Sequence, residues 1–307
     1  MKDAARTLQR RVLEHIRTAQ LWDEGQSVLV AVSGGVDSTV LLHLLHRTQG
    51  AHGGRLRVVT VDHGLREASS VEADGVVKLS EALGLSCDRV RLELAPGPNL
   101  AERARDARRS VLLGFQTDRI ATGHHEGDQA ETVLYHLLRG SGMRGLKGMQ
   151  AQSGAWVRPL LREPRAVLEA WARSEGIDWV EDPSNANSQR GRIREILPVL
   201  DELHGGANRA LARSSRLLAR EDEYLSSHVD EAWGAVAIDG GLDRAALMAL
   251  HPAIQLRLLR RLIGDVRVRA DPLEVVVAGA LMHSGQLDLG YGYCLVCRDG
   301  VLGVKKP

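Results

Sequence analysis

One short segment of the chain combines residue types that can hold the phosphates of a nucleotide. Residues 28–32 are apolar and predict a buried strand, and Ser33-Gly34-Gly35-Val36-Asp37-Ser38-Thr39 follows it directly. Two adjacent glycines let the backbone bring its N–H groups close to an anion, and the N-terminus of the predicted helix adds partial positive charge. The Asp37 carboxylate can bind a divalent cation beside the phosphates. The alternative is a glycine-rich turn with no ligand.

A pair of carboxylates forms a second candidate site. Asp128 and Glu131 lie three residues apart in a segment whose pattern predicts a helix over 127–139. That spacing places both side chains on one helix face. Two carboxylates held together can bind a metal, act as acid and base, or receive an ammonium group. The alternative is a charged first helical turn that interacts favourably with the helix dipole.

Alternating strand and helix patterns would position these side chains. Strands are predicted over 27–32, 56–61, 88–94 and 119–122, and helices over 38–48, 70–83, 99–114 and 127–139. This alternation indicates βαβ units and a doubly wound parallel sheet. In such sheets ligands bind at the carboxyl ends of the strands. Ser33, Asp62-His63 and His124-His125 all follow predicted strands, so the sequence predicts one site that gathers them.

The remainder of the chain predicts a smaller second domain. Residues 140–148 are rich in glycine and predict a mobile connection or a loop that closes over an anionic substrate. His204-Gly205-Gly206 marks the predicted boundary, which gives domains of 1–204 and 205–307. Helices are predicted over 207–232, 242–250 and 252–263, and Asp299-Gly300 predicts a terminal β-hairpin. The fold class expected is α/β, a doubly wound parallel sheet with a mainly helical C-terminal domain that ends in a hairpin.

Composition narrows the class of protein. The 307 residues are 44% apolar and 26% charged, with a net charge of +1, which is typical of an ordinary globular protein. The three cysteines do not make a disulfide framework, and no apolar run approaches membrane-spanning length. The charged N-terminus lacks the apolar core of a signal peptide. We therefore predict a cytoplasmic protein with no membrane contact.

A net charge near zero gives no sign of nucleic-acid binding, but the arginines are unevenly placed. Arg209, Arg213, Arg216 and Arg220 recur at helical spacing, so their guanidinium groups share one helix face. Their acidic neighbours stand mainly at one end, in residues 221–223. This arginine stripe either contacts a phosphate backbone or is a solvated face.

Several blocks of residues resemble known families. Ser33-Gly34-Gly35-Val36-Asp37-Ser38 resembles the pyrophosphate loop of the N-type ATP pyrophosphatases, the PP-loop superfamily, and lacks a Walker lysine. Together with 61–66, 123–149, 158–161 and 181–185, in this order, it resembles tRNA(Ile)-lysidine synthetase. The resemblance implies a Rossmann-like PP-loop catalytic domain. It implies an ATP-dependent ligase that adenylates C2 of the wobble cytidine in the CAU anticodon of isoleucine tRNA, after which the ε-amino group of L-lysine displaces AMP.

The resemblance also implies roles for matching residues. ATP would be bound by Ser33, Gly34, Gly35, Val36, Asp37, Ser38, Thr39 and His63. Asp37 and Asp128 would hold Mg²⁺, and Asp128 and Glu131 would recognise the substrate lysine. The residues expected to take part in catalysis are Asp37, Asp128, Glu131 and His124. Transfer RNA would contact Arg105, Arg108, Arg192 and Arg194, and the arginine stripe would add Arg209, Arg213, Arg216 and Arg220. The sequence does not fix the oligomeric state; a homodimer is one option.

Three positions depart from the family pattern. Gly127 stands where an Asp is usual, Arg109 where a Tyr is usual, and Gly191 where an Asn is usual. These changes affect contacts around the site and the details of metal binding more than the pyrophosphate loop.

Three alternative functions can be weighed against the sequence. A PP-loop tRNA thiolase needs cysteines near the loop, whereas Cys294 and Cys297 lie in the predicted hairpin and would point to opposite faces of a strand. A small-molecule synthetase of the amidotransferase type would not need the arginine stripe, which counts against this function. A non-catalytic RNA-binding protein on the same fold would tolerate loss of Ser33 or Asp37, and both are present.

Overall fold

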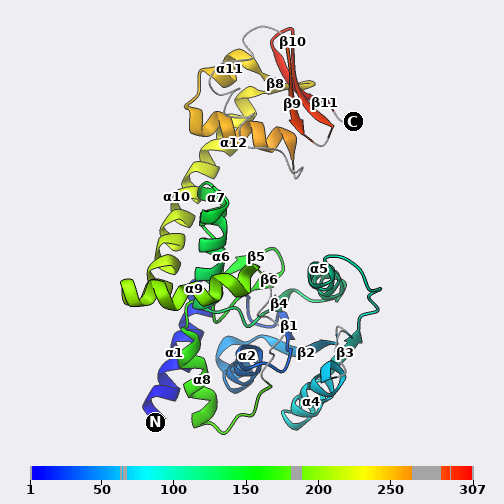
Figure 1. The fold of residues 1–307 in the computed structure, drawn as a ribbon, viewed down its shortest axis with the longest axis vertical. Coiled ribbons are helices and arrows are strands. Elements are labelled where there is room, and N and C mark those ends of the chain that lie inside the picture. Colours follow the sequence, from blue (N-terminus) through cyan, green and yellow to red (C-terminus); the bar gives the residue numbers. More distant parts are fainter. Residues whose placement is uncertain are drawn as a thin grey trace. The chain divides into compact units, whose positions relative to one another are not determined.

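The computed structural model describes residues 2–62, 64, 68–180, 189–264, 285–290 and 292–305. The chain divides into two compact units, Met1–Ala219 and Arg220–Pro307, and Figure 1 labels their elements. The division falls inside helix α10 (Ala207–Val236), beyond the His204–Gly206 segment at which the sequence analysis places a boundary. The boundary at 204 stays a prediction.

The first unit alternates strands and helices in the predicted order. Its strands are β1 (Ser27–Ala31), β2 (Arg55–Asp62), β3 (Cys87–Arg91), β4 (Arg119–Ala121), β5 (Gln152–Ser153) and β6 (Trp156–Val157). Its helices are α1 (Lys2–Thr18), α2 (Val36–Arg47), α3 (Gln49–His52), α4 (Ala68–Ala82), α5 (Leu100–Leu113), α6 (Glu126–Leu138), α7 (Met143–Leu146), α8 (Arg165–Ser174), α9 (Gln189–Leu203) and the first part of α10. The four predicted strands, the three helices between them and the helix after the last strand are confirmed to within a few residues.

The strands of this unit form one sheet in the order β3-β2-β1-β4-β6-β5. All pairs are parallel except β5 with β6. The chain moves outward from β1 through β2 to β3 and then returns to β4 on the other side of β1. The strand order therefore reverses between β1 and β4, which is where such sheets bind their ligands.

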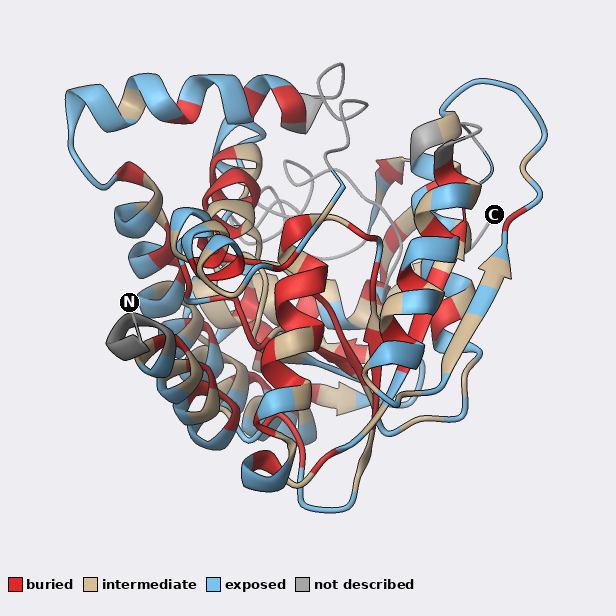
Figure 2. Ribbon diagram, turned by 90° about the horizontal axis from the view of Figure 1, so that it is seen from below, coloured by how far each residue is buried: buried red, intermediate tan, exposed pale blue. Residues whose placement is uncertain are grey.

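Alternate residues of β1 build the two faces of the sheet. Val28 and Val30 belong to a core that also contains residues of α1, α2, α4 and α8. Leu29 faces the other way and packs with Leu112 of α5 and Ile120 of β4. Figure 2 shows the buried residues concentrated along the strands and on the helices against them. The doubly wound parallel sheet is therefore confirmed, and it fixes the ends of β1 and β4 rigidly.

The second unit contains more sheet than the predicted hairpin. Strands β7 (Ala237–Ile238), β8 (Gly241–Asp243), β9 (Gly285–Gly290), β10 (Tyr293–Arg298) and β11 (Val301–Lys305) pair antiparallel in the order β7-β8-β11-β10-β9. Helices α11 (Arg244–Met248) and α12 (Pro252–Ile263) supply Leu247, Leu258 and Leu259 to its core. The turn at Asp299-Gly300 is confirmed, with positive φ at both residues.

Strand β10 also places the two cysteines as its alternation predicts. Cys297 is buried in the core of the second unit, whereas Cys294 lies 2.9 Å from the side-chain nitrogen of Gln286.

None of the helices in the described part of the chain has the length and apolar character needed to span a membrane.

Candidate active site

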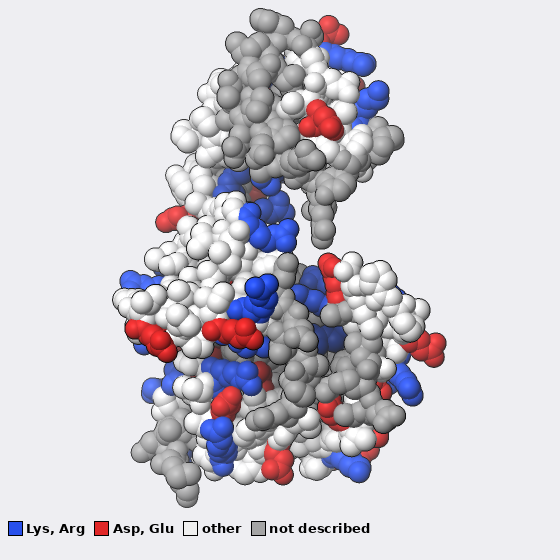
Figure 3. Space-filling model, viewed as in Figure 1, with Lys and Arg blue, Asp and Glu red and all other residues white. Residues whose placement is uncertain are grey.

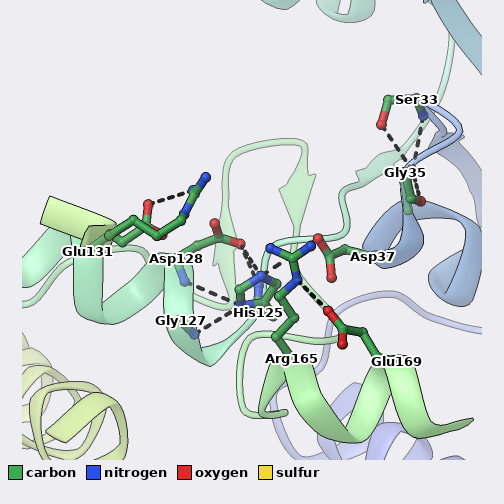
Figure 4. A network of polar contacts seen from close by, with 11 residues as sticks. Ser33, Gly35, Asp37, His125, Gly127, Asp128, Glu131, Arg165 and Glu169 are labelled. Atoms are coloured by element: carbon green, nitrogen blue, oxygen red, sulfur yellow. Dashed lines mark hydrogen bonds and ion pairs between the residues drawn. The ribbon is translucent and has the colours of Figure 1, made fainter. Parts of the chain in front are cut away.

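The segment after β1 forms a tight loop that leads into α2. Gly34 has φ +86°, a conformation that favours glycine. The Ser38 hydroxyl accepts a hydrogen bond from the Ser33 backbone N–H at 3.1 Å and donates one to the Gly35 carbonyl at 3.1 Å (Figure 4). Val36 and Thr39 are buried behind it. The loop therefore holds its shape through its own hydroxyl and backbone groups.

Helix α2 begins without a side-chain cap. Its N-cap is Gly35, which has no side chain to accept a hydrogen bond from the first turn. The first backbone N–H groups of a helix have no partner within the helix, and the helix dipole gives this end partial positive charge. This end of α2 can bind an anion such as a phosphate group.

The loop after β4 packs directly against the start of α2. A Cβ atom on Gly123 would lie 2.9 Å from both the Asp37 carbonyl carbon and the Ser38 nitrogen. No side chain fits there, so Gly123 brings the start of α6 next to the start of α2. The two segments singled out in the sequence thus meet across the reversal point of the sheet.

His125 caps helix α6, a role that sequence reasoning did not predict. Its Nδ1 atom accepts hydrogen bonds from the backbone N–H groups of Gly127, at 3.0 Å, and Asp128, at 3.4 Å. Asp128 Oδ2 in turn accepts from the His125 backbone N–H at 3.0 Å, which completes a capping box. The sequence signal was weak because Ser, Thr, Asp and Asn are the usual N-cap residues.

The other ring nitrogen of His125 lies between two carboxylates. Nε2 is 3.7 Å from Asp37 Oδ2 and 3.5 Å from Asp128 Oδ2. Figure 4 shows both carboxylates directed towards the ring, one from α2 and one from α6, with Arg165 of α8 close to Asp37. Asp37 and Asp128, which the sequence analysis assigns to one metal site, are therefore brought together.

The environment of Asp37 fits a bound cation. Burial raises the pKa of Asp37, which the charges of His125 and Arg165 only partly oppose. Its Oδ1 atom is buried and has no hydrogen-bond partner. A divalent cation would satisfy this oxygen and favour the ionised carboxylate. Within the described ranges no group of three or more His, Cys, Asp or Glu side chains is arranged to hold a metal ion by itself, and Mg²⁺ commonly binds through one or two carboxylates together with phosphate oxygens.

Glu131 already has a partner. Arg194 of α9 donates from Nε to Oε1 at 2.6 Å and from Nη2 to Oε2 at 3.0 Å, and the Glu131 side chain is 6% exposed. Two parallel hydrogen bonds of this kind are among the strongest charge-assisted contacts. Glu131 is therefore not free to meet a substrate ammonium group in this arrangement, and Arg194 lies beside the site instead of on a separate surface.

His124 faces a group of arginines. Its Nδ1 atom is 2.8 Å from the Thr122 hydroxyl. The pKa of His124 is lowered to about 4, chiefly by burial; Asp128 opposes this, and Arg158, Arg108 and Arg105 add to it. His124 is consequently neutral at physiological pH. Arg105 and Arg108, predicted to contact tRNA, thus stand near the same strand end as the carboxylate pair.

The remaining predicted arginines lie on α9 and α10. Arg192 is exposed on α9, and Arg209, Arg213, Arg216 and Arg220 are exposed on α10. Figure 3 shows basic and acidic side chains interspersed on the face that it presents. Arg209 and Arg216 are near enough to Glu126 of α6 to oppose the rise in its pKa that burial causes. His63 and the block 181–185 lie outside the described residues.

The structure describes all three positions that depart from the family pattern. The guanidinium of Arg109 lies over the Trp156 ring, 5.1 Å from its centroid, which is a cation–π contact. Gly127 lies under the His125 ring, since a Cβ there would be 2.8 Å from the ring Cε1 atom. Gly191 is buried in the first turns of α9.

Sequence reasoning also missed Gln129 of α6, whose side chain makes hydrogen bonds at the end of the glycine-rich segment. Its side chain donates to the Met149 carbonyl at 3.0 Å and accepts from the Met149 N–H at 2.8 Å. It also donates to the Ser215 hydroxyl of α10 at 2.6 Å. The segment predicted as a mobile connection therefore contains the short helix α7 and ends in hydrogen bonds to α6.

Comparisons with known proteins agree with this geometry. A family model described as the PP-loop domain matches residues 4–200. A tRNA(Ile)-lysidine synthase from Methylobacterium nodulans is 37% identical, over 98% of this chain and 96% of the relative. One from Thermobifida fusca is 40% identical, over 78% and 76%. One from Pseudomonas putida is 36% identical, over 78% of this chain but 60% of the relative, so the chain spans only part of some relatives.

A solved structure shares the fold. It is described as the U34-tRNA thiolase NcsA from Methanococcus maripaludis with its [4Fe-4S] cluster, and it aligns with 71% of this chain and 81% of its own at 20% identity and a TM-score of 0.60. At this identity the likeness concerns the fold alone.

Proposed function

This chain belongs to the PP-loop family of tRNA(Ile)-lysidine synthases, and we propose that it ligates L-lysine to C2 of the wobble cytidine in a CAU anticodon of isoleucine tRNA. The observation that carries the proposal is the meeting of Asp37 and Asp128 at His125 Nε2, beside the uncapped start of α2. An anion site and a two-carboxylate cation site lie next to each other, as a metal–nucleotide complex requires.

In the proposed first step, the cytidine C2 oxygen attacks the α-phosphorus of ATP and pyrophosphate leaves. The loop 33–39 and the start of α2 hold the phosphates through backbone N–H groups and the Ser33 and Thr39 hydroxyls. Asp37 and Asp128 are the residues that would hold Mg²⁺, which supplies charge neutralisation on the phosphates. With no Walker lysine in the loop, we expect cleavage between the α- and β-phosphates.

In the proposed second step, the lysine ε-amine attacks C2 and AMP leaves. Asp128 and Glu131 are the carboxylates that we assign to lysine recognition. Because Arg194 makes two hydrogen bonds to Glu131, an ammonium group must share the remaining lone pairs of that carboxylate with Arg194 or displace it. His124 is neutral and stands at the same strand end, so its ring offers one nitrogen that can accept a proton and one N–H that can donate a hydrogen bond.

The remaining assignments concern tRNA. We assign phosphate contacts to Arg105, Arg108 and Arg192 near the site and to the arginine stripe on α10. Guanidinium groups on one exposed helix face suit a phosphate backbone and carry no base specificity. ATP, lysine and tRNA are all cytoplasmic molecules, so we expect the reaction in the cytoplasm.

One experiment tests this function. Pure protein is incubated with ATP, labelled lysine and either a CAU-anticodon isoleucine tRNA transcript or elongator methionine tRNA. We expect lysine to enter the isoleucine tRNA alone, with AMP and pyrophosphate as products. ADP with orthophosphate, or equal labelling of both transcripts, would reject the proposal, and an Asp37→Asn variant is the control for contaminating activity.

The rival thiolase activity has less support in the described residues. Cys87 lies on β3, whereas Cys294 and Cys297 lie in the second unit on opposite faces of β10. The same incubation with a sulfur donor in place of lysine tests it, and thiolated product would favour it.

A further inference from the structure

We propose that His125 is a positioning residue that holds the Asp37 and Asp128 carboxylates in register for a divalent cation, and that Gly127 is the residue that makes room for it. The inference rests on the proposed function for the cation and its nucleotide. It gives His125 a role of its own, whereas the sequence analysis only grouped it with His124 at a strand end.

The hydrogen bonds of the ring fix which nitrogen carries the hydrogen. Nδ1 accepts from two backbone N–H groups at the start of α6, so it cannot itself be protonated. The hydrogen must be on Nε2, which therefore presents a positive N–H dipole to Asp37 Oδ2 and Asp128 Oδ2. At 3.7 and 3.5 Å these are shared electrostatic contacts and not direct hydrogen bonds.

This arrangement sorts the oxygens of the two carboxylates. The Oδ2 atoms face the ring, and Asp128 Oδ2 also accepts from the His125 backbone N–H. The Oδ1 atom of Asp37 is buried and unpartnered. One oxygen of each carboxylate thus faces His125, and the Oδ1 atom of Asp37 is left for a cation. Groups that orient metal ligands in this way commonly affect metal affinity about 10- to 100-fold.

Gly127 is the counterpart of this ring position. A Cβ at residue 127 would stand 2.8 Å from the ring Cε1 and 3.1 Å from Nδ1. The atoms it meets belong to a side chain that can rotate, so a larger residue would displace the ring without forcing the backbone apart. Once displaced, the ring would lose both the helix cap and its place between the carboxylates.

Two substitutions separate the functions of the two ring nitrogens. An asparagine places its Oδ1 where histidine has Nδ1, so His125→Asn keeps the helix cap and removes the group between the carboxylates. A glutamine has no acceptor at that position but carries an amide N–H farther out, near the place of Nε2. His125→Ala removes both. The readouts are the melting temperature, and the affinity for Mn²⁺ with a non-hydrolysable ATP analogue followed by electron paramagnetic resonance.

We expect His125→Asn and His125→Gln to differ in opposite directions in melting temperature and in Mn²⁺ affinity. His125→Asn should melt near the wild type but bind Mn²⁺ with the analogue about tenfold more weakly. His125→Gln should melt lower but retain more Mn²⁺ affinity than His125→Asn. If His125→Asn binds Mn²⁺ as tightly as the wild type, or more tightly, His125 has no positioning role and the inference falls. If the wild type itself binds no Mn²⁺ with the analogue, the proposed function fails first.

A double-mutant cycle tests the link to Gly127. Gly127→Ala alone should lower both the melting temperature and the Mn²⁺ affinity, as His125→Ala does. In the His125→Ala background the ring is gone, and the same change should raise the melting temperature, because alanine favours helix more than glycine does. A Gly127→Ala effect that is the same in both backgrounds would show that Gly127 does not act through the ring.

Discussion

Helices α2 and α6 start next to each other at the reversal point of the sheet, and their first turns are treated in opposite ways. The N-cap of α2 is Gly35, with no side-chain hydrogen bond, whereas the N-cap of α6 is His125, which accepts from two N–H groups. Gly123 brings the two ends into contact. Both helices follow a parallel strand and carry an aspartate in the first turn, Asp37 and Asp128.

The difference assigns a ligand to each helix end. The first-turn N–H groups of α2 have no side-chain acceptor and are left for an external anion. At α6 the ring nitrogen uses those groups, so what this end offers is its carboxylates. One end thus attracts phosphate and the other attracts a cation or an ammonium group, and the reaction proposed here needs both at a short distance. The predictions below each change one side of this comparison.

The largest effect should come from a substitution that caps the uncapped start of α2. Gly35 has φ −72° and ψ 159°, and a Cβ there would be 3.7 Å from the nearest atom, so an aspartate fits. Gly35→Asp would cap α2 with its own carboxylate, which gains only a few tenths of a kcal/mol over glycine as a cap. The same charge would repel phosphate. We expect ATP affinity to fall by roughly 100-fold or more, about 3 kcal/mol, with no loss in melting temperature.

Gly35→Ala is the matched control, since it adds the Cβ without the charge. It should lose much less ATP affinity than Gly35→Asp. Equal losses in the two variants would mean that space and not charge governs this end, and retained affinity in Gly35→Asp would remove the anion site from α2.

The contrast between the two ends was only half predictable from the sequence. The loop after β1 is predictable because glycines, hydroxyls and Asp37 are contiguous and their chemistry is local. The cap of α6 is not, because His124 and His125 are equivalent in a motif. The choice between them depends on the extended backbone of His125, with φ −123° and ψ −178°. The Gln129 contacts likewise depend on chain segments that the fold alone brings together.

Longer-range contacts explain the other differences. The resemblance implies that Glu131 recognises lysine, which stays a prediction. Its partner Arg194 was not foreseen, because Arg194 comes from 63 residues away and only the fold places it there. In the second unit, β7 and β8 were missed because strands of two or three residues carry no detectable alternation. Their pairing depends on β11, which also comes much later in the chain.

The next largest effect concerns the carboxylates near the start of α6, the helix that His125 caps. Glu131→Gln should raise the lysine KM about ten- to hundredfold, since a contact between charged groups is worth about 1.5–3 kcal/mol, while the ATP KM changes little. Arg194→Ala frees Glu131, so we expect it to lower the melting temperature without raising the lysine KM. Added lysine should then restore part of the lost melting temperature.

Steady-state kinetics and thermal melts on both variants decide this point. If Arg194→Ala and Glu131→Gln raise the lysine KM equally, the pair acts as one structural unit and Glu131 is not a lysine ligand. If instead ATP binding collapses in Glu131→Gln, the carboxylates at the start of α6 bind the metal and not lysine.

A smaller effect should follow from pushing the two helix ends apart. Gly123→Ala places a Cβ 2.9 Å from backbone atoms of Asp37 and Ser38, which cannot rotate away. Overpacking of this kind costs about 1–3 kcal/mol, and each kcal/mol lowers the melting temperature of a unit of this size by about 2–4 °C. Mn²⁺ affinity should fall with it, because Asp37 and Asp128 separate. Gly75→Ala, in α4 with no atom within 4 Å, is the control and should not destabilise.

The smallest effect should come from the arginine stripe, which lies outside both helix ends. Arg213 and Arg216 are exposed on α10, and we expect them to contact tRNA phosphates. Each lost phosphate contact reduces the log–log salt slope of binding by about 0.7–0.9, so Arg213→Ala with Arg216→Ala should flatten it by somewhat under two units. ATP-analogue and Mn²⁺ binding should be unchanged, because the α2 and α6 ends are intact.

The control removes the same charge elsewhere. Arg6 and Arg10 are exposed on α1, and their double alanine variant should leave the salt slope as it is. If the stripe were only a solvated face, its variant would also keep the wild-type slope, and any loss of lysine transfer would follow a lower melting temperature. A flattened slope at an unchanged melting temperature, with both helix ends still binding their ligands, would separate recognition of the RNA backbone from the chemistry between α2 and α6.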